Sequence, residues 1–228
     1  MVQRARRAVV FTGAGISTEC GIPDFRSPGG FWTRYKPIEY SAFLASEDTR
    51  LEAWRRFLMI RETIAKAEPG PSHRAVARLV QLGHVSHVIT QNIDGLHQKA
   101  GNDPDRVIEV HGTVWWTRCW DCQDRRPMAE SLERVRAGED DPPCLACGGI
   151  LKSDTISFGQ ALVPEVIERA MNVSDECDVM LAVGSTLSVF PAANCVPRAK
   201  AAGDELRMDA PPLEAGPHGR FNKLGEAL

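Results

Sequence analysis

Four cysteines are the residues whose spacing most clearly indicates chemistry. They form two C-x-x-C pairs, Cys119 with Cys122 and Cys144 with Cys147, and residues 123–143 lie between the pairs. This spacing is typical of two knuckles that close a tetrahedral zinc site. Four thiolates fill the coordination sphere of zinc and leave no position for water or substrate, so the pattern predicts a structural zinc ion rather than a catalytic one.

The segment between the cysteine pairs contains few large apolar residues, so we expect metal binding to supply its stability. Two alternatives remain open: four unrelated buried thiols, or a zinc ribbon that binds nucleic acid or protein. Basic residues are not concentrated around the module, which disfavours a phosphate-binding face. The other cysteines, Cys20, Cys177 and Cys195, are expected to be buried or half-buried thiols.

A second candidate site follows the apolar run at residues 8–11, which ends at Thr12-Gly13-Ala14-Gly15. A buried strand that enters a tight glycine turn is typical of the start of a nucleotide-binding α/β unit. The glycines alone are a weak signal, because many strand-to-helix turns need glycine without any ligand. The dehydrogenase fingerprint requires a third glycine where Ser17 and Thr18 stand, so hydride transfer is disfavoured.

Small or polar residues also follow three other β-rich runs. Residues 85–90 end at Gln91-Asn92-Ile93-Asp94, residues 107–110 end at His111-Gly112, and residues 178–183 end at Gly184-Ser185-Thr186. Ligands of open parallel sheets bind beyond the carboxyl ends of the strands. The four clusters are therefore predicted to line one pocket.

The elements that position these clusters alternate between strands and helices. Helical periodicity covers residues 51–64, 73–82 with Ser72 as N-cap, and 164–171 with a proline at the start. The alternation predicts an α/β fold, a Rossmann-like parallel sheet with crossover helices. Two stretches interrupt it, a helical insertion at 31–71 and the zinc-binding insertion at 117–150, which leave 1–30, 72–116 and 151–228 for the large domain.

Composition narrows the class of protein. The chain has 228 residues, is 43% hydrophobic and carries a formal net charge of -3, which suits a medium globular unit with a sizeable core. No long block of one charge sign predicts a polyanion-binding surface, so direct nucleic-acid binding is not expected. No apolar run approaches the roughly 18–20 residues that cross a bilayer, and no secretory signal is evident, so we expect a cytoplasmic protein without membrane contact.

Several of these motifs occur together in a known order. They are residues 13–17 (GAGIS), 21–26 (GIPDFR), 90–97 (TQNIDGLH), 111–112 (HG), the two cysteine pairs, 158–160 (FGQ) and 184–189 (GSTLSV). Over about residues 8–200 the sequence resembles the sirtuins, NAD-dependent protein deacylases, of the bacterial type. The resemblance implies a Rossmann-like large domain, a small zinc-containing module, and a cleft between them where NAD and an acyl-lysine peptide meet.

The resemblance also implies roles for individual residues. The cofactor loop would contain Gly13, Ala14, Gly15, Asp24, Phe25 and Arg26; Gln91, Asn92 and Asp94 would surround nicotinamide and its ribose; Gly184, Ser185 and Ser188 would meet the adenosine half; and Phe158, Gly159 and Val189 would pair with the substrate peptide. His97 is expected to be structural, as a partner of residues in the site.

The residue types suit the implied reaction, which yields nicotinamide, O-acyl-ADP-ribose and free lysine. Asn92 and Asp94 can stabilise the positive charge that develops as the nicotinamide bond breaks. A base must then activate a ribose hydroxyl, and His111, at a strand end, can titrate near neutral pH. Asn92 and His111 are therefore the expected catalytic residues.

Two other readings remain. A mono-ADP-ribosyltransferase with the sirtuin fold would use the same cofactor loop but would not need a base for deacylation, so His111 favours the deacylase. A non-enzymatic zinc-ribbon or NAD-binding module is the alternative from another class. Measurement of NAD consumption distinguishes it from an enzyme.

Two departures from the family bear on specificity and stability. Leu58 stands three residues before Arg61, where succinyl- and malonyl-removing members have a Tyr-x-x-Arg pair, so neutral acyl groups are favoured. Residues 204–212 are charged and proline-rich where a buried last strand is expected, and Asp209 is the candidate for an adenosine contact. We therefore expect an incomplete last sheet position and reduced stability or weakened NAD affinity.

Overall fold

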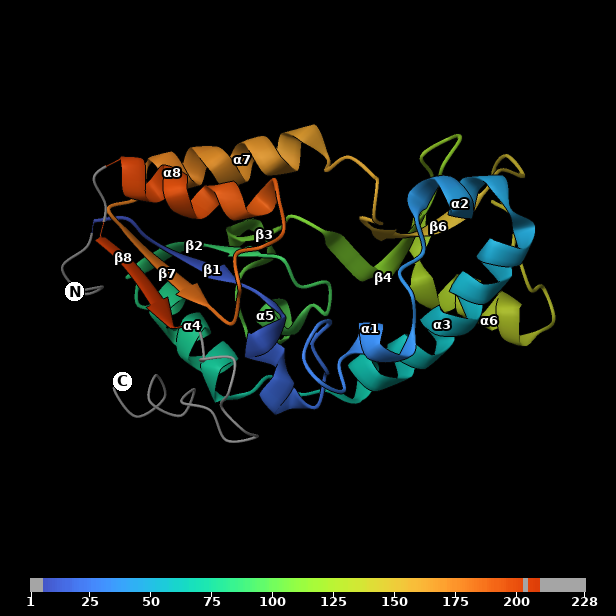
Figure 1. The fold of residues 1–228 in the computed structure, drawn as a ribbon, viewed down its shortest axis with the longest axis horizontal. Helices are drawn as coiled ribbons and strands as arrows, with labels where there is room; N and C mark the ends of the chain where they lie inside the picture. The colour runs from blue at the N-terminus through green and yellow to red at the C-terminus, as the bar shows by residue number, and fades with distance from the viewer. Residues whose placement is uncertain (1–5, 203–204, 210–228) are drawn as a thin grey trace.

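A parallel five-stranded sheet is the larger of two sheets in the computed structural model, which describes residues 6–202 and 205–209 (Figure 1). The strand order is β3-β2-β1-β7-β8, with the crossovers expected of a Rossmann-like sheet. The bounds are β1 Ala8–Thr12, β2 Val85–Thr90, β3 Val107–Glu109, β7 Val179–Val183 and β8 Glu205–Asp209. The predicted α/β class and the four predicted strands are confirmed, with ends that shift by no more than a residue.

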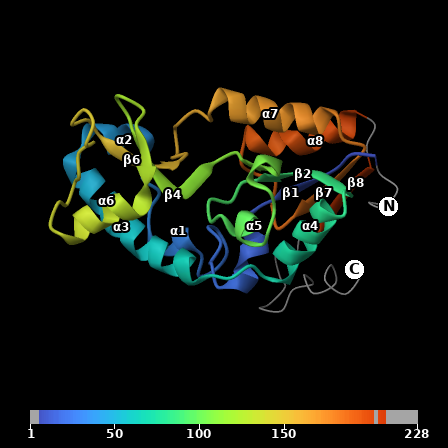
Figure 2. The same ribbon diagram turned by 180° about the vertical axis from the view of Figure 1, so that it is seen from behind.

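Helices cover both faces of this sheet. In both ribbon views α7 and α8 lie on one face, and α4 and α5 lie on the other (Figures 1 and 2). Successive side chains of β1 point to opposite faces, so Val9 and Phe11 pack in the cluster with Ala170 of α7, while Val10 packs in the cluster with Val76 of α4. These helices span α4 Pro71–Gln81, α5 Leu96–Lys99, α7 Pro164–Asp175 and α8 Cys195–Ala201.

The start of α4 corrects one expectation. Gly70 is the N-cap and Pro71 is the first helical residue, so Ser72 lies inside the first turn and is not the N-cap. Proline is well suited to that position, because its missing N–H would have no helical partner and its φ is already helical. The backbone N–H of Ser72 instead donates to Glu19 Oε1 at 3.1 Å.

The smaller sheet is antiparallel, in the order β5-β4-β6, and lies with helices in a second lobe (Figures 1 and 2). The elements of this part of the chain are α1 Phe31–Arg34, α2 Tyr40–Ala45, α3 Glu47–Lys66, β4 Gly112–Cys119, β5 Arg125–Pro127, α6 Met128–Arg136 and β6 Leu151–Thr155. Short 3-10 helices at η2 Ala14–Cys20, η3 Pro104–Arg106 and η4 Ala192–Asn194 complete the described elements.

The zinc-binding insertion has more of an apolar core than its sequence indicated. Met128 and Leu132 of α6, which the sequence analysis did not predict, are almost fully buried. They pack with Trp54 of α3, whose side chain has no exposed area, and with Leu151 of β6. The segment is therefore stabilised partly by a core that it shares with the helical insertion.

Strand β8 corrects the expectation of an incomplete last sheet position. Its backbone pairs in parallel with β7 from Val179↔Glu205 to Val183↔Asp209. Main-chain groups form this pairing whatever side chains the strand has, and an edge strand needs less apolar character than a central one. The side chain of Asp209 lies outside the described part of the structure, so its adenosine contact stays a prediction, as does the weakened NAD affinity.

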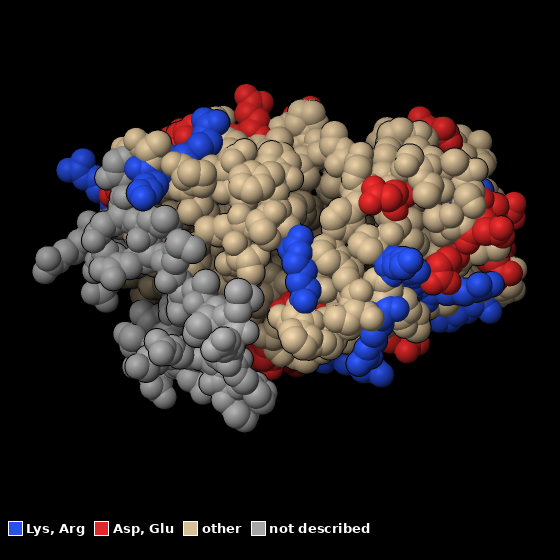
Figure 3. All heavy atoms as spheres, viewed as in Figure 1, with Lys and Arg blue, Asp and Glu red and all other residues tan. Residues whose placement is uncertain are grey.

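Surface charge and the apolar character of the helices bear on possible nucleic-acid and membrane contacts. On the face drawn in Figure 3 basic and acidic side chains are interspersed. Within residues 6–202 and 205–209, no helix combines the length and the apolar character that crossing a bilayer requires.

Candidate active site

The loops that follow β1 and β7 approach each other at backbone distance. The N–H of Gly13 donates to the Val183 carbonyl at 3.1 Å, and the N–H of Gly15 donates to the Gly184 carbonyl at 2.8 Å. A Cβ on Gly184 would lie 2.3 Å from the nitrogen of Ile16, and Gly184 has a φ of +64°. Only glycine fits this contact, so the sequence brings two of the predicted cofactor segments together with its smallest residue.

Asn92 and Asp94 meet through a residue that the sequence analysis did not assign. The Nδ2 group of Asn92 donates to the Gly13 carbonyl and to Ser17 Oγ, both at 3.1 Å, and Ser17 Oγ donates to Asp94 Oδ2 at 2.7 Å. Asn92 and Asp94 are 7% and 5% exposed. Both Nδ2 hydrogens are thus used, and Asn92 keeps Oδ1 as an acceptor. Ser17 lies where the dehydrogenase fingerprint requires a third glycine, and this departure was the feature of the sequence that could have identified it.

His111 is held in one tautomer. Its Nδ1 lies 3.0 Å from the Gln91 carbonyl, which can only accept, so Nδ1 carries the proton and Nε2 keeps its lone pair. Burial lowers the pKa of His111 below its usual value of 6.5, and the hydrogen bond to Gln91 partly offsets this. A neutral imidazole with an unprotonated Nε2 can act as a general base near pH 7.

Gln91 and Ser185 connect the ends of β2 and β7. Gln91 Nε2 donates to Ser185 Oγ at 2.7 Å, and Ser185 Oγ also accepts from the backbone of Leu187 at 3.2 Å. Ser188 lies further along the same loop, where its hydroxyl is 2.8 Å from that of Thr186. Three of the four predicted strand-end clusters are therefore joined by side-chain hydrogen bonds or backbone contacts, and His111 joins the fourth through Gln91.

The Asp24-Phe25-Arg26 segment forms a separate turn. The Asp24 carboxylate accepts from the Ser27 backbone at 2.9 Å and from the Ser27 hydroxyl at 2.5 Å. The Phe25 ring lies 5.3 Å from the ring of Trp32, and the Arg26 guanidinium stacks 4.7 Å above the same ring. These contacts fix the segment beside α1.

The predicted peptide residues lie on two loops. The Phe158 carbonyl accepts from the Tyr40 backbone at 2.8 Å, and its ring packs 5.0 Å from Trp32 while 42% of the residue stays exposed. Gly159, with a φ of +76°, turns the chain directly after it. Val189, on the loop after β7, is half-buried.

His97 is connected to Asn92 by a chain of buried hydrogen bonds. It is almost fully buried, and its Nε2 lies 2.9 Å from Thr12 Oγ1, which contacts Thr90 Oγ1 at 2.8 Å. Thr90 Oγ1 accepts from the Asn92 backbone at 3.0 Å. Burial first, and then the neighbouring His73, lower the pKa of His97 to about 3, so it remains a neutral hydrogen-bonding group, as a structural role requires.

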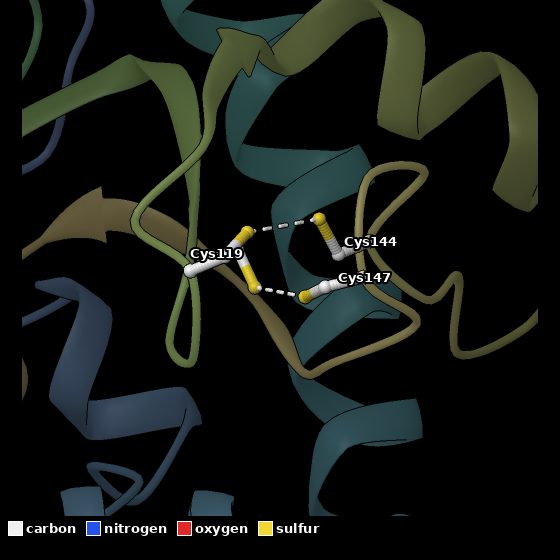
Figure 4. A group of neighbouring side chains, drawn as sticks. Cys119, Cys144 and Cys147 are labelled. Atoms are coloured by element: carbon white, nitrogen blue, oxygen red, sulfur yellow. Dashed lines mark hydrogen bonds between the residues drawn. The ribbon is translucent and has the colours of Figure 1, made fainter.

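The four paired cysteines converge in the small lobe (Figure 4). Cys119 Sγ lies 3.5 Å from Cys147 Sγ, Cys122 Sγ lies 3.7 Å from Cys144 Sγ, and all four sulfurs lie within 4.8 Å of one another. Disulfide sulfurs would be about 2 Å apart, whereas a tetrahedral zinc ion with bonds of about 2.3 Å separates its sulfurs by about 3.8 Å. The cluster fits zinc and would close its coordination sphere.

The parallel sheet, the glycine contact between β1 and β7, and the polar strand ends define a nucleotide-binding α/β protein with a structural metal module. The family model of the Sir2 family matches residues 13–191, and this chain belongs to that family. NAD-dependent protein deacetylase 1 of Bradyrhizobium diazoefficiens is 48% identical over 206 residues, which cover 90% of this chain and 81% of that protein.

Solved structures of the family have the same fold. A mutant Sir2 homologue in complex with ADP ribose has a TM-score of 0.84 and 31% sequence identity, and the match covers 99% of this chain and 90% of that one. A Sir2 complex with a p53 peptide and NAD+ has a TM-score of 0.81 and 30% identity, over 91% of this chain and 82% of that one.

Proposed function

We propose that the protein is an NAD-dependent protein lysine deacylase that converts NAD and an acyl-lysine protein or peptide to nicotinamide, O-acyl-ADP-ribose and free lysine. The observation that carries the proposal is the tautomer of His111, whose unprotonated Nε2 is available at the sheet edge beside Gln91. The name of the Bradyrhizobium relative and the solved peptide–NAD+ complex support it.

Each residue of the strand-end cluster has a role in this proposal. NAD would supply a ribose carbon to which the acyl oxygen of the substrate bonds as the bond from that carbon to nicotinamide breaks. Asn92 offers Oδ1 and Asp94 a buried negative charge, and both stabilise the positive charge that develops there. His111 Nε2 then takes the proton of a ribose hydroxyl. The Gln91 carbonyl, which accepts a hydrogen bond from Nδ1–H, stabilises the resulting imidazolium.

The remaining residues hold the two substrates. Cofactor contacts fall to Gly13, Ala14, Gly15, Asp24, Phe25, Arg26, Gln91, Gly184, Ser185 and Ser188, and the peptide pairs by its main chain between Phe158-Gly159 and Val189. Arg61 stacks 3.7 Å above Trp115 rather than beside a tyrosine, which supports a preference for neutral acyl groups.

The proposal extends to organisation and location. The NAD-binding domain comprises 1–30, 72–116 and 151–228, with insertions at 31–71 and 117–150. The protein acts in the cytoplasm and does not bind nucleic acid directly, a proposal supported by the mixed charge of the face drawn in Figure 3.

The test compares wild type with His111→Ala. Zinc-loaded protein is incubated with NAD and an acetyl-lysine peptide, and mass spectrometry follows nicotinamide and the deacetylated peptide. Wild type should release both, and loss of a general base should slow deacylation by about 10²–10⁴-fold. His84→Ala, a partly buried histidine on the turn between α4 and β2, is the matched control and should behave as wild type.

The other outcomes separate the alternatives. Release of nicotinamide with an intact acetyl group would replace the proposal with ADP-ribosyl transfer or NAD hydrolysis. No release of nicotinamide by wild type would leave a binding module.

A further inference from the structure

A second group of potential metal ligands lies outside the four-cysteine cluster. Among the described residues, Glu19, Cys20 and His73 place one ligand atom each within 4.8 Å of the others. Glu19 and Cys20 end η2, and His73 lies in the first turn of α4, so the group joins two elements that are far apart in sequence. Cys20 Sγ lies 3.6 Å from His73 Nδ1.

The backbone around the group is shaped to admit the carboxylate. Glu19 Oε1 accepts from the Ser72 backbone at 3.1 Å, which fixes the side chain beside the start of α4. A Cβ on Gly70 would lie 2.4 Å from this oxygen, so a side chain at position 70 would displace the carboxylate. A carboxylate has about four lone-pair sites, and this one retains capacity for a cation.

His73 has the surroundings of a ligand histidine. It is fully buried, and its Nε2 and the Nδ1 of His97 are both buried without a hydrogen-bond partner. The two rings are neighbours, with centroids 5.0 Å apart. A histidine that binds metal through Nδ1 keeps its proton on Nε2, so a metal ion bound on the Cys20 side of His73 would leave the proton on the other ring nitrogen.

A surface pocket gives access to the group. It is lined by Cys20, Gly21, Met59, Glu62, Thr63, Lys66 and Ala67, so one residue of the group forms part of its wall beside the end of α3. Glu19, which precedes Cys20 in the chain, is exposed. An ion could enter from solvent and retain a coordination position that faces the pocket.

We propose that Glu19, Cys20 and His73 form a second zinc site, with three protein ligands and a fourth position open to the pocket. One sulfur, one nitrogen and one oxygen ligand suit zinc, which accepts all three, and do not suit magnesium or calcium, which prefer oxygen. Unlike the closed cluster of four thiolates, this site can exchange its ion. It fixes the end of η2 to α4, and it does not depend on the proposed deacylase activity.

The test measures metal stoichiometry in folded protein whose four-cysteine site already holds zinc. Zinc is titrated in competition with a chromophoric chelator, and Co²⁺ is added separately to detect thiolate-to-metal absorption. Wild type should bind one ion beyond the first, and its melting temperature should rise with that ion because only the folded state assembles the ligands.

Three variants make the test specific. Cys20→Ser and Glu19→Gln should each weaken the second ion by at least about tenfold, a loss comparable to that of other metal-site contacts. Glu19→Gln retains an oxygen acceptor for the Ser72 backbone and should fold normally. Cys195→Ser, at a buried thiol in the core of the large sheet, is the matched control and should retain the second ion.

Two results would overturn the proposal. One is a wild-type protein that binds a single zinc ion. The other is a second ion that survives Cys20→Ser unchanged, because that ion would lie elsewhere and leave Cys20 and His73 as a hydrogen-bonded pair.

Discussion

At the scale of single residues, the described site depends on hydrogen bonds that set which atom carries a proton. The Gln91 carbonyl places the proton of His111 on Nδ1, and Ser17 divides its hydroxyl between Asn92 and Asp94. Both arrangements are made by groups that are adjacent only in the fold. They determine which nitrogen of His111 can accept a proton and which oxygen of Asn92 remains free to accept a hydrogen bond.

The pKa of His111 gives the first prediction. Burial lowers this pKa below 6.5, so the base is neutral above that value and loses activity only as the pH falls through the lowered pKa. A profile of kcat/KM for deacylation against pH should therefore have its acidic midpoint below 6.5. A midpoint above 6.5 would mean that the imidazole is exposed or paired with a negative group in the active enzyme.

Ser17 gives the second prediction. Ser17→Ala leaves Asp94 Oδ2 and one hydrogen of Asn92 Nδ2 without their partner, at a cost of about 1–3 kcal/mol. If the pair stabilises the transition state, nicotinamide release should slow by about 10- to 100-fold. Ser174→Ala, at a buried serine of α7 whose hydroxyl donates to the Ala170 carbonyl, is the control and should retain the rate.

An unchanged rate in Ser17→Ala would show that the Asn92–Asp94 pair is held by other contacts.

The sequence could predict the four strand-end clusters, because residue type and strand position are local properties. It could not predict Ser17 as their link, because that depends on how the turn after β1 folds back toward β2.

At the scale of elements, the zinc module and α3 stabilise each other. Arg50 of α3 donates to Asp141 Oδ2 at 2.6 Å, and Trp54 of the same helix donates to Asp141 Oδ1 at 3.3 Å. The side chains of Arg50 and Asp141 are only 14% and 20% exposed. One carboxylate thus joins the loop before Cys144 to the helical insertion.

Asp141→Ala should therefore destabilise this lobe by about 2 kcal/mol, the usual loss for a hydrogen bond to a charged group. Zinc should also leave faster when a chelator is added, because the loop that carries Cys144 and Cys147 loses its anchor. Asp140→Ala, at an exposed neighbour, is the matched control. Equal zinc release from both variants would show that the cysteines alone hold the loop.

The helices that the sequence predicted include those with strong periodicity, such as α4 and α7. It missed α6, because its few apolar residues are buried against Trp54 rather than within their own segment. It misplaced the N-cap of α4, because the favourable serine stands behind a proline that already starts the helix. It did not predict β8 as a complete strand, because backbone pairing at a sheet edge does not require a pattern of apolar side chains.

At the scale of the whole molecule, β8 protects the edge of the large sheet. Without it β7 would present unpaired N–H and C=O groups to solvent. A chain that ends at Ala202 should melt several degrees lower than a chain that ends at Asp209, since each kcal/mol corresponds to about 2–4 °C for a protein of this size. Equal melting temperatures, measured by circular dichroism, would show that the strand adds no stability.

One of the chain segments that connect the two lobes contains the proposed base, His111. The chain leaves the parallel sheet at His111, enters β4 one residue later, and returns along β6 so that the Ile156 backbone N–H donates to the His111 carbonyl at 2.9 Å. His111 therefore lies at the connection between the two lobes. A rotation of the small lobe about this point would therefore be transmitted to the His111 imidazole through the main chain, and the direction of the proposed base would depend on the position of that lobe.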